Sequence, residues 1–337
     1  MQIGVIYPQT ELRGDPEAVR QFALAAERLG YQHVNAYDHV VGASHDNREP
    51  ALWGPYTEAD PFHDPFVLFA YLAGITTLEF ATDVLILPQR QTVLVAKQAA
   101  DLDLLSGGRF RLGVGTGWNY VEYDALGYDF ASRGARLDEQ IDFLRRLWSE
   151  STIEWQGRFD RINRGSILPK PTRSIPIWVG GFSDPAFRRG ARRGDGFLFA
   201  RDVESAMEGR ERVRHFAAEA GRDLAGFGWE LTANRASTPP EMAQMACCKA
   251  GHDNCPMHDS AADCCKQNSS SPQAQWSVVT KADSLNAPDR VFLMFVTVPN
   301  PLSDAALLVQ PVRAAAPSPL LRPVGPPVYI AFSTLLI

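Results

Sequence analysis

Short runs of apolar residues alternate with longer amphipathic segments through the first two thirds of the chain. The segments between the runs carry apolar residues three or four positions apart, which is typical of helices that pack one face against a sheet. This alternation predicts a parallel sheet whose strands are joined by right-handed helical crossovers. The predicted strands are residues 3–8, 33–39, 78–87, a short strand within residues 106–119, and residues 175–181 and 195–199, with residues 228–233 as a possible seventh.

Capping residues mark the start of several predicted helices. Asp15-Pro16 and Asp64-Pro65 each supply a side-chain acceptor followed by a first-turn proline, and Ser183-Asp184-Pro185 has the same character. Gly30 and Gly74 follow the first two of these helical segments, as expected at helix ends. We therefore expect helices to begin beside these three prolines.

Two architectures contain such a parallel sheet, a (β/α)8 barrel and a doubly wound sheet. Polar and glycine residues fall at the carboxyl ends of successive predicted strands, as Asp38-His39, Thr82-Asp83, Thr116-Gly117-Trp118 and Gly180-Gly181. Barrel enzymes carry their functional sites on that rim. The sequence therefore favours an α/β fold of the (β/α)8, or TIM-barrel, type.

One strand carries glycines on a single face. Gly113, Gly115 and Gly117 alternate with apolar residues in a period-two pattern. Glycine inside a strand makes room for something that approaches the backbone closely, here either a flat ligand or protein atoms packed at a barrel corner. The pattern is not a Rossmann fingerprint, which would need glycine in place of Trp118, and it is not a Walker motif.

Composition and charge exclude several classes of protein. The 337 residues carry a formal net charge of −6, which argues against general nucleic-acid binding because that function requires a basic face. The sequence contains no apolar run that approaches the ~18 residues of a membrane span. Residues 1–7 lack the basic and apolar pattern of a secretion signal. We therefore expect a cytoplasmic protein.

The alternation ends near residue 236, where the composition changes. All five cysteines lie in one short segment, as Cys247, Cys248, Cys255, Cys264 and Cys265, with His252 and His258 among them. Clustered thiols and imidazoles have the composition of a soft-metal site, although their spacing matches no common zinc module. The alternative is an unstructured cysteine-rich tail.

The rest of the tail is equally atypical. Residues 299–327 are rich in proline and alanine, which predicts disorder. Residues 291–296 form an apolar run that could be a strand and could close the barrel. The predicted organisation is a barrel domain over residues 1–235, incomplete at its C-terminal end, and a largely disordered tail over residues 236–337.

An ordered series of specific motifs also runs through the first 235 residues. They are Leu85-Ile86-Leu87-Pro88-Gln89-Arg90, Ala96-Lys97-Gln98, Leu102-Asp103-Leu104-Leu105-Ser106-Gly107-Gly108-Arg109, Gly113-Val114-Gly115-Thr116-Gly117-Trp118-Asn119, Glu122-Tyr123, Arg133-Gly134, Leu137-Asp138-Glu139, Pro169-Lys170-Pro171, Ile177-Trp178-Val179-Gly180-Gly181 and Gly194-Asp195-Gly196. In this order they resemble the luciferase-like monooxygenase superfamily, and within it the branch of oxidoreductases that depend on the deazaflavin coenzyme F420. The resemblance covers about residues 1–235.

The resemblance implies a (β/α)8 barrel that binds a flavin or deazaflavin ring at its C-terminal rim. The implied cofactor is coenzyme F420, with FMN as the alternative, and no resident metal is implied. The implied partners are a small-molecule substrate and a second copy of the chain. The matching positions are Asp38 and His39 near the ring, Thr82, Asp83 and Val84 in a bulge that often contains a non-proline cis peptide, Gly115, Thr116, Gly117, Trp118 and Asn119 beside the cofactor, and Gly180, Gly181 and Phe182 at its ribityl or phosphate tail.

His39 and Glu122 are the candidate catalytic residues. A hydride that moves to or from a ring needs a proton partner, and histidine exchanges protons near neutral pH. The alternatives are a hydrogen-bonded rim histidine for His39 and a surface carboxylate for Glu122. Some members of the family carry an acidic residue where this chain has Trp118, which leaves the proton donor open.

Three functions remain open from the sequence. The first is an F420-dependent oxidoreductase that transfers a hydride to or from a small organic substrate, and the second is an FMN-dependent monooxygenase that uses molecular oxygen. The third is a soft-metal-binding protein that acts through its cysteine-rich tail. Members of the family continue with a final helix, an eighth strand and a terminal helix, which residues 236–337 do not resemble. An open barrel would leave the edges of its first and seventh strands unpaired.

Overall fold

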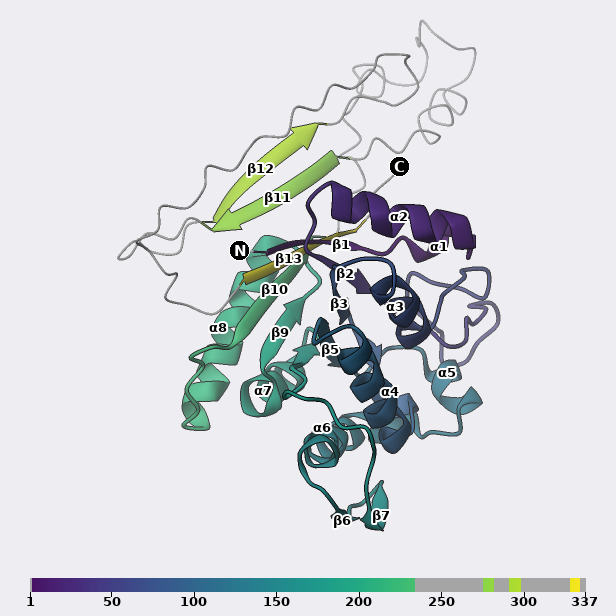
Figure 1. Ribbon diagram of the computed structural model, residues 1–337, viewed down its shortest axis with the longest axis vertical. Helices are drawn as coiled ribbons and strands as arrows, with labels where there is room; N and C mark the ends of the chain where they lie inside the picture. Colours follow the sequence, from purple (N-terminus) through teal and green to yellow (C-terminus); the bar gives the residue numbers. More distant parts are fainter. Residues whose placement is uncertain (1, 234–274, 282–290, 298–327, 334–337) are drawn as a thin grey trace, which may run out of the picture. The chain divides into compact units, whose positions relative to one another are not determined.

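Residues 2–233, 275–281, 291–297 and 328–333 are described by the computed structural model shown in Figure 1. Its contacts divide the chain into two units, one formed by residues 1–234 with 325–337 and the other by residues 235–324. In the first unit strands and helices alternate as the sequence predicts, and this unit carries the candidate site.

A nine-stranded parallel sheet forms the centre of the first unit. Its strands are β1 (Gln2–Ile6), β2 (His33–Ala36), β3 (Glu79–Thr82), β4 (Leu85–Ile86), β5 (Phe110–Gly115), β8 (Ile177–Gly180), β9 (Gly196–Phe199), β10 (Gly228–Ala233) and β13 (Val328–Ser333). Neighbours follow the order β3-β2-β1-β13-β10-β9-β8-β5-β4, and β3 also pairs with β5. This additional pairing brings the two ends of the strand order together, so the sheet curls into an α/β barrel.

Helices surround the curled sheet (Figure 1). The α-helices are α1 (Gln9–Leu12), α2 (Pro16–Arg28), α3 (Pro65–Ala73), α4 (Thr92–Leu105), α5 (Tyr120–Ala125), α6 (Arg133–Ser149), α7 (Asp184–Arg193) and α8 (Val203–Glu219). Two short 3-10 helices cover Leu87–Gln89 and Phe130–Ser132. An antiparallel hairpin of β6 (Ile153–Gln156) and β7 (Arg161–Gly165) follows α6.

The predicted caps fix where α2 and α3 begin. The Asp15 carboxylate accepts hydrogen bonds from the backbone N–H groups of Glu17 and Ala18, and Asp64 does the same for Phe66 and Val67. Ser183 stands at the N-cap position of α7 without a side-chain cap bond. The local cap residues therefore predict all three starting points, and two of the three are held by side chains.

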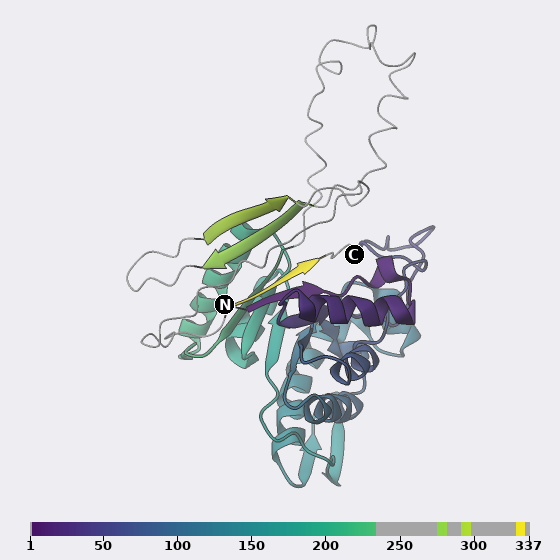
Figure 2. The same ribbon diagram turned by 45° about the horizontal axis from the view of Figure 1, so that its top comes forward.

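The C-terminal part of the barrel departs from regular alternation. β13 lies between β1 and β10 and pairs in parallel with both, as Figure 2 shows for β1. The edges of β1 and β10 are therefore paired, contrary to the expectation for an open barrel. The described residues beyond 233 include strands but no helix. In the part of the chain that the structure describes, the alternation of strands and helices is therefore incomplete at this end, although the sheet closes.

The expectation that residues 291–296 close the barrel is wrong. They belong to β12 (Val291–Thr297), which pairs with β11 (Gln275–Lys281) in an antiparallel hairpin. An apolar run predicts a strand but carries no information about its partner, and residues 328–333 supply the parallel strand instead. The cysteine-rich segment and the proline-rich segment lie outside the described residues.

The third predicted strand is divided in two. β3 ends at Thr82 and β4 begins at Leu85, and the peptide bond between Asp83 and Val84 is cis. This bulge places a turn of backbone at the carboxyl end of the sheet, beside the ends of β2 and β5. It sits at the position where the family resemblance implies a bulge.

Candidate functional site

His39 and Glu122 meet where the carboxyl ends of β2 and β5 lead into loops. Nδ1 of His39 lies 3.3 Å from Oε2 of Glu122, and Oε1 of Glu122 accepts hydrogen bonds from the backbone N–H groups of Val40 and Val41. Glu122 is only 1% exposed, so its interpretation as a surface carboxylate is wrong. The two residues proposed for proton chemistry therefore form one hydrogen-bonded pair, in which Glu122 is buried and His39 is partly exposed.

Asn119 sets the position of this pair. Its side-chain oxygen caps α5 by accepting hydrogen bonds from the backbone N–H groups of Val121 and Glu122. Its side-chain nitrogen donates to the carbonyl oxygen of Val41, 3.2 Å away. One side chain thus fastens the helix that carries Glu122 to the loop that follows His39.

Aromatic rings enclose the imidazole of His39. Its ring centroid lies 4.8 Å from that of Phe62, 5.3 Å from Tyr56 and 5.5 Å from Trp118. Burial raises the pKa of Tyr56 to about 12, so its phenol keeps its proton at neutral pH. Trp118 also packs against Trp53, whose ring is 71% exposed. The long loop after β2 therefore covers the predicted catalytic histidine.

The carboxylate of Asp38 is hydrogen-bonded within the protein, to Ile86 and Arg90. Its carboxylate accepts hydrogen bonds from the backbone N–H of Ile86 at 2.9 Å and from Nε and Nη2 of Arg90. Nη1 of Arg90 pairs with Asp64, the residue that caps α3. Burial raises the pKa of Asp38, while the charge and hydrogen bonds of Arg90 oppose that rise. Asp38 thus joins β2 to the segment after the bulge.

The space left by the glycines of β5 is filled by other atoms of the protein. A Cβ atom on Gly113 would lie 1.9 Å from the carbonyl oxygen of Thr82, and one on Gly115 would lie 2.4 Å from Cγ2 of Val84. Gly180 likewise leaves room for Val84, whose Cγ1 would be 2.6 Å from a Cβ there. These glycines therefore allow the bulge between β3 and β4 to pack against β5 and β8. Of the two explanations for the strand glycines, a flat ligand or close-packed protein atoms, these contacts fit the second.

The interior below the bulge holds a buried polar cluster. Oε1 of Glu230 lies 3.0 Å from Nε2 of His33 and accepts a hydrogen bond from Nδ2 of Asn35 at 2.7 Å, while Oε2 accepts from Nη1 of Arg111 at 2.8 Å. Nδ2 of Asn35 also lies 3.4 Å from Oδ2 of Asp83. The Asp83 carboxyl further accepts from the Thr232 hydroxyl at 2.5 Å. Asp83 thus links the bulge to β2 and β10.

The pKa values of the two carboxyl groups in this cluster, Asp83 and Glu230, are shifted in opposite directions. Burial, together with the nearby charge of Glu230, raises the pKa of Asp83 to about 7. Burial would also raise the pKa of Glu230, but the charges of Arg111 and His33 and their hydrogen bonds outweigh it and lower the pKa to about 2. Near neutral pH the cluster therefore holds an ionised Glu230 and an Asp83 that exchanges a proton.

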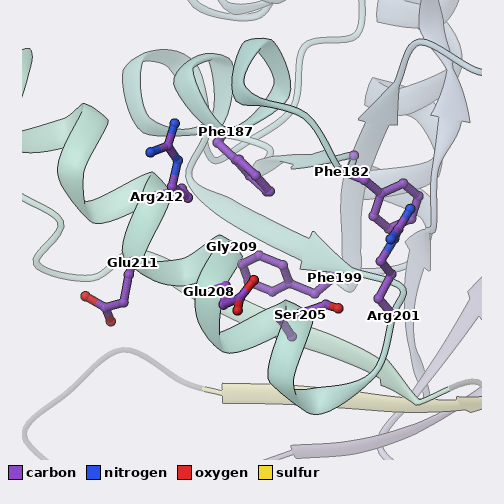
Figure 3. A pocket seen from close by; sticks show the side chains of 11 residues that line it. Phe182, Phe187, Phe199, Arg201, Ser205, Glu208, Gly209, Glu211 and Arg212 are labelled. Atoms are coloured by element: carbon purple, nitrogen blue, oxygen red, sulfur yellow. The ribbon is translucent and has the colours of Figure 1, made fainter.

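A pocket of about 530 Å³ lies beside the residues predicted to hold the cofactor tail, Gly180, Gly181 and Phe182. Gly181 and Phe182, just beyond β8, form part of its wall (Figure 3). Phe187 of α7, Phe199 at the end of β9, Arg201 in the loop that follows and side chains of α8 form the rest. Phe182 is 53% exposed, and Gly181 has a φ of 148°, a backbone conformation that favours glycine. The backbone at Gly181 and the side chain of Phe182 are therefore accessible at this pocket.

The predicted site residues thus fall into three groups. His39, Glu122, Asn119 and Trp118 come together at one part of the rim, while Gly180, Gly181 and Phe182 lie near the pocket. The side chains of Asp38, Thr82 and Asp83 are turned into the protein. The hydroxyl of Thr82 donates a hydrogen bond to the carbonyl oxygen of Gly113. The hydroxyl of Tyr123 donates a hydrogen bond to the carbonyl oxygen of Thr116.

Sequence reasoning missed Arg90, Arg111 and Glu230 as parts of the site. Arg90 lies inside one of the quoted motifs, so its position after the third strand was an available signal. Arg111 and Glu230 lie inside strands 119 positions apart, and no local pattern connects them. Within the described residues no group of three or more metal-ligating side chains gathers, and none of the helices there is long and apolar enough to cross a membrane.

The fold and the rim define an α/β-barrel enzyme with a hydrogen-bonded His39–Glu122 pair at the carboxyl ends of its strands. The chain belongs to the luciferase-like monooxygenase family, whose sequence pattern matches residues 1–242. Members of this family are flavin- or F420-dependent monooxygenases and oxidoreductases.

Three relatives illustrate the range of similar sequences. The uncharacterized protein Rv0940c of Mycobacterium tuberculosis is 38% identical over 210 residues, which are 59% of this chain and 71% of that protein. An F420-dependent glucose-6-phosphate dehydrogenase of Segniliparus rotundus is 29% identical over 63% of this chain and 62% of its own length. The pyrimidine monooxygenase RutA of Acinetobacter baylyi is 30% identical over 49% of this chain and 47% of its own length.

Solved structures share the fold at low sequence identity. The monooxygenase RslO1 of Streptomyces bottropensis matches with a TM-score of 0.58 and 22% identity, over 69% of this chain and 71% of that one. An F420-dependent secondary alcohol dehydrogenase in complex with an F420-acetone adduct matches with a TM-score of 0.57 and 20% identity, over 68% of each chain. These matches establish the luciferase-like barrel.

Proposed function

We propose that the chain is an F420-dependent oxidoreductase that moves a hydride between the cofactor and a small organic substrate. The observation that carries this proposal is the buried Glu122 carboxylate that holds His39 at 3.3 Å on the rim where barrel enzymes act. The F420-dependent dehydrogenase matches 225 residues of this chain and the pyrimidine monooxygenase 176, which supports an F420-dependent dehydrogenase reaction over a monooxygenase reaction.

His39 exchanges the proton that accompanies the transfer. Bound F420 would supply hydride chemistry: a substrate that is reduced gains a hydride and a proton, and a substrate that is oxidised loses both. Because Oε1 of Glu122 accepts two backbone hydrogen bonds and Oε2 is an acceptor beside the imidazole, the carboxyl group selects the tautomer of His39 in which Nδ1 carries the proton. Nε2 of His39 is then the atom that exchanges a proton with the substrate.

The residues of the rim fit a flat cofactor with an anionic tail. Val84 lies against Gly115 and Gly180, where a Cβ atom would collide with it, so the bulge and the two glycines form a low, close-packed surface. We assign Val84, with the backbone from Thr116 to Trp118, to the ring, and Gly181 and Phe182 to the tail. Asp38, Thr82 and Asp83 support this surface from beneath, because their side chains are buried.

The second candidate is an FMN-dependent monooxygenase. The match to pyrimidine monooxygenase RutA favours it. Reduced FMN activates molecular oxygen, whereas a deazaflavin does not sustain that chemistry, so the identity of the bound cofactor decides between the two. The soft-metal hypothesis concerns residues 247–265, which lie outside the described residues, and it stays a prediction.

Cofactor titration tests the proposal. Purified full-length protein is titrated with F420 and with FMN, each oxidised and reduced, and fluorescence quenching is followed. We expect saturable binding of F420 and weaker binding of FMN. Preferential binding of FMN with oxygen consumption would establish the monooxygenase instead, and binding of neither cofactor would contradict both.

A histidine variant tests the assigned role. His39→Gln keeps a polar side chain but cannot exchange a proton, so we expect F420 binding to persist while the transfer rate falls about 100-fold or more. His215→Gln is the matched control, because His215 pairs with Glu219 on the exposed face of α8. Equal transfer rates in the two variants would exclude His39 as the proton-exchanging residue.

A further inference from the structure

The pocket between α7 and α8 carries a cation and an aromatic ring at its rim end. Figure 3 shows Phe182 and Arg201 together on one side, with Phe187 and Phe199 facing the interior. The guanidinium carbon of Arg201 lies 4.5 Å from the centroid of the Phe182 ring. Arg201 and Phe182 are both exposed. The entrance therefore combines a positive charge with an apolar surface.

Arg201 differs from the other arginine of the pocket in its partners. Arg212 pairs with Asp184 through two hydrogen bonds. Arg201 makes no salt bridge with any residue in the part of the chain that the structure describes. Its contact with Phe182 is a cation–π interaction, which leaves N–H donors of the guanidinium able to make a charge-assisted hydrogen bond. Arg201 can therefore bind an anionic group while keeping its contact with Phe182.

The interior of the pocket is apolar, and its other charged lining residues all come from α8. Phe187 and Phe199 pack around Gly209, where a Cβ atom would lie 2.8 Å from Phe199 and 3.1 Å from Phe187. Glu208 and Glu211 line the pocket from α8, and Glu211 is paired with Arg214. Because Arg212 is paired with Asp184 and carboxylates repel an anion, the anionic group of a ligand belongs beside Arg201.

We propose that this pocket binds an organic anion whose phosphate or carboxylate group pairs with Arg201 and whose apolar part lies against Phe182, Phe187 and Phe199. The anion has two potential sources with the same chemistry. It is either the tail of the cofactor, since Gly181 and Phe182 border both sites, or a separate small molecule. The first source rests on the proposed function, and the second does not.

The probe for the pocket itself is 8-anilinonaphthalene-1-sulfonate, an aromatic anion whose fluorescence increases in apolar surroundings. We expect saturable binding to the full-length protein, weakened about three- to ten-fold by Arg201→Gln because one charge-assisted contact at an exposed site is lost. Arg201→Lys keeps the charge and should retain most of the affinity.

Arg188→Gln is the matched control for this experiment. Arg188 also lies over a phenylalanine ring, that of Phe216, at 4.6 Å, and it is exposed on α7, but it does not line the pocket. Its substitution should leave the affinity for the probe unchanged. Failure of the probe to saturate, or equal affinities of wild type and Arg201→Gln, would overturn the proposal.

Competition separates the two sources of the anion. F420 and its tail-less chromophore F0 share the ring but differ in the anionic tail. If the cofactor tail occupies the pocket, F420 displaces the probe, F0 does not, and Arg201→Gln weakens F420 binding without affecting F0. If F420 and F0 both bind without displacing the probe, the pocket serves a separate anion. Binding of neither F420 nor F0 contradicts the proposed function, while the response of the probe to Arg201→Gln still tests the pocket.

Discussion

The imidazole of His39 and the carboxylate of Glu122 lie 3.3 Å apart although the two residues are 83 positions apart in the sequence. Their contact joins the end of β2 to the first turn of α5. Because Glu122 also accepts two backbone hydrogen bonds from the loop after His39, the carboxylate fixes both the ring and the chain that carries it. We therefore expect both the stability of the rim and the proposed proton exchange to depend on Glu122.

Replacing Glu122 should affect both properties at once. Glu122→Gln turns an acceptor into an amide whose NH2 group cannot accept the Nδ1 proton of His39, and it leaves buried donors poorly satisfied. We expect the free energy of unfolding to fall by about 1–3 kcal/mol, measured by urea denaturation, and the transfer rate to fall with it. Glu219→Gln removes an exposed histidine partner and should change neither by a comparable amount.

The raised pKa of Asp83 makes stability depend on pH. A carboxyl group with a folded pKa of about 7 and an ordinary unfolded value stabilises the fold at low pH, and that contribution is lost as the pH rises from about 4 to about 7. Asp83→Asn stays neutral, so its free energy of unfolding should fall less than that of the wild type between pH 4.5 and pH 7.5.

Urea denaturation at these two pH values measures the difference. The control is Asp184→Asn, which removes an exposed carboxylate outside the buried cluster. If Asp83→Asn and the wild type lose the same free energy of unfolding over this range, Asp83 does not titrate as assigned.

Arg90 should be more important for stability than an exposed arginine. Its removal in Arg90→Gln leaves the fully buried Asp38 carboxylate without its cation, and breaking a buried pair in this way typically lowers the free energy of unfolding by about 3–5 kcal/mol. The double variant Asp38→Asn/Arg90→Gln removes both charges and should recover part of the loss, as a double-mutant cycle would show. Additive losses would mean that the two side chains do not interact.

The close packing at Gly113 gives a further prediction. A Cβ atom there would lie 1.9 Å from the carbonyl oxygen of Thr82, which is backbone and cannot turn aside. Gly113→Ala should therefore lower the melting temperature sharply. In Gly134→Ala, in α6, the nearest heavy atom is 3.5 Å from the new Cβ, and helix propensity predicts a gain of about 0.5–1 kcal/mol. Similar melting temperatures for the two variants would contradict this packing.

Local patterns predicted those parts of the fold that local interactions create. The starts of α2 and α3 follow from Asp15 and Asp64, whose carboxylates bond to N–H groups two and three residues ahead. The rim positions of His39 and Glu122 follow from the strand order, because parallel strands bring their carboxyl ends together. These features needed no knowledge of distant contacts.

The buried networks could not be predicted in this way. Arg111 meets Glu230 across 119 positions, and Asp83 meets Thr232 across 149. Each of these residues, taken alone, is an ordinary polar residue in a strand. The same limit applies to the closing strand, since the apolar runs at residues 291–296 and 328–333 resemble each other until their partners are known.

The place of β13 between β1 and β10 bears on how the barrel forms. Residues 234–327 separate β10 from β13, so the last two pairings require the closure of a long loop. The entropy of closure rises only by about 0.6 kcal/mol for each doubling of loop length, which equilibrium stability tolerates. Folding rate, however, falls as contacts become less local. Before β13 is in place, the edges of β1 and β10 are unpaired and can bind the same edges of other chains. We therefore expect the yield of refolded protein to decline as its concentration rises.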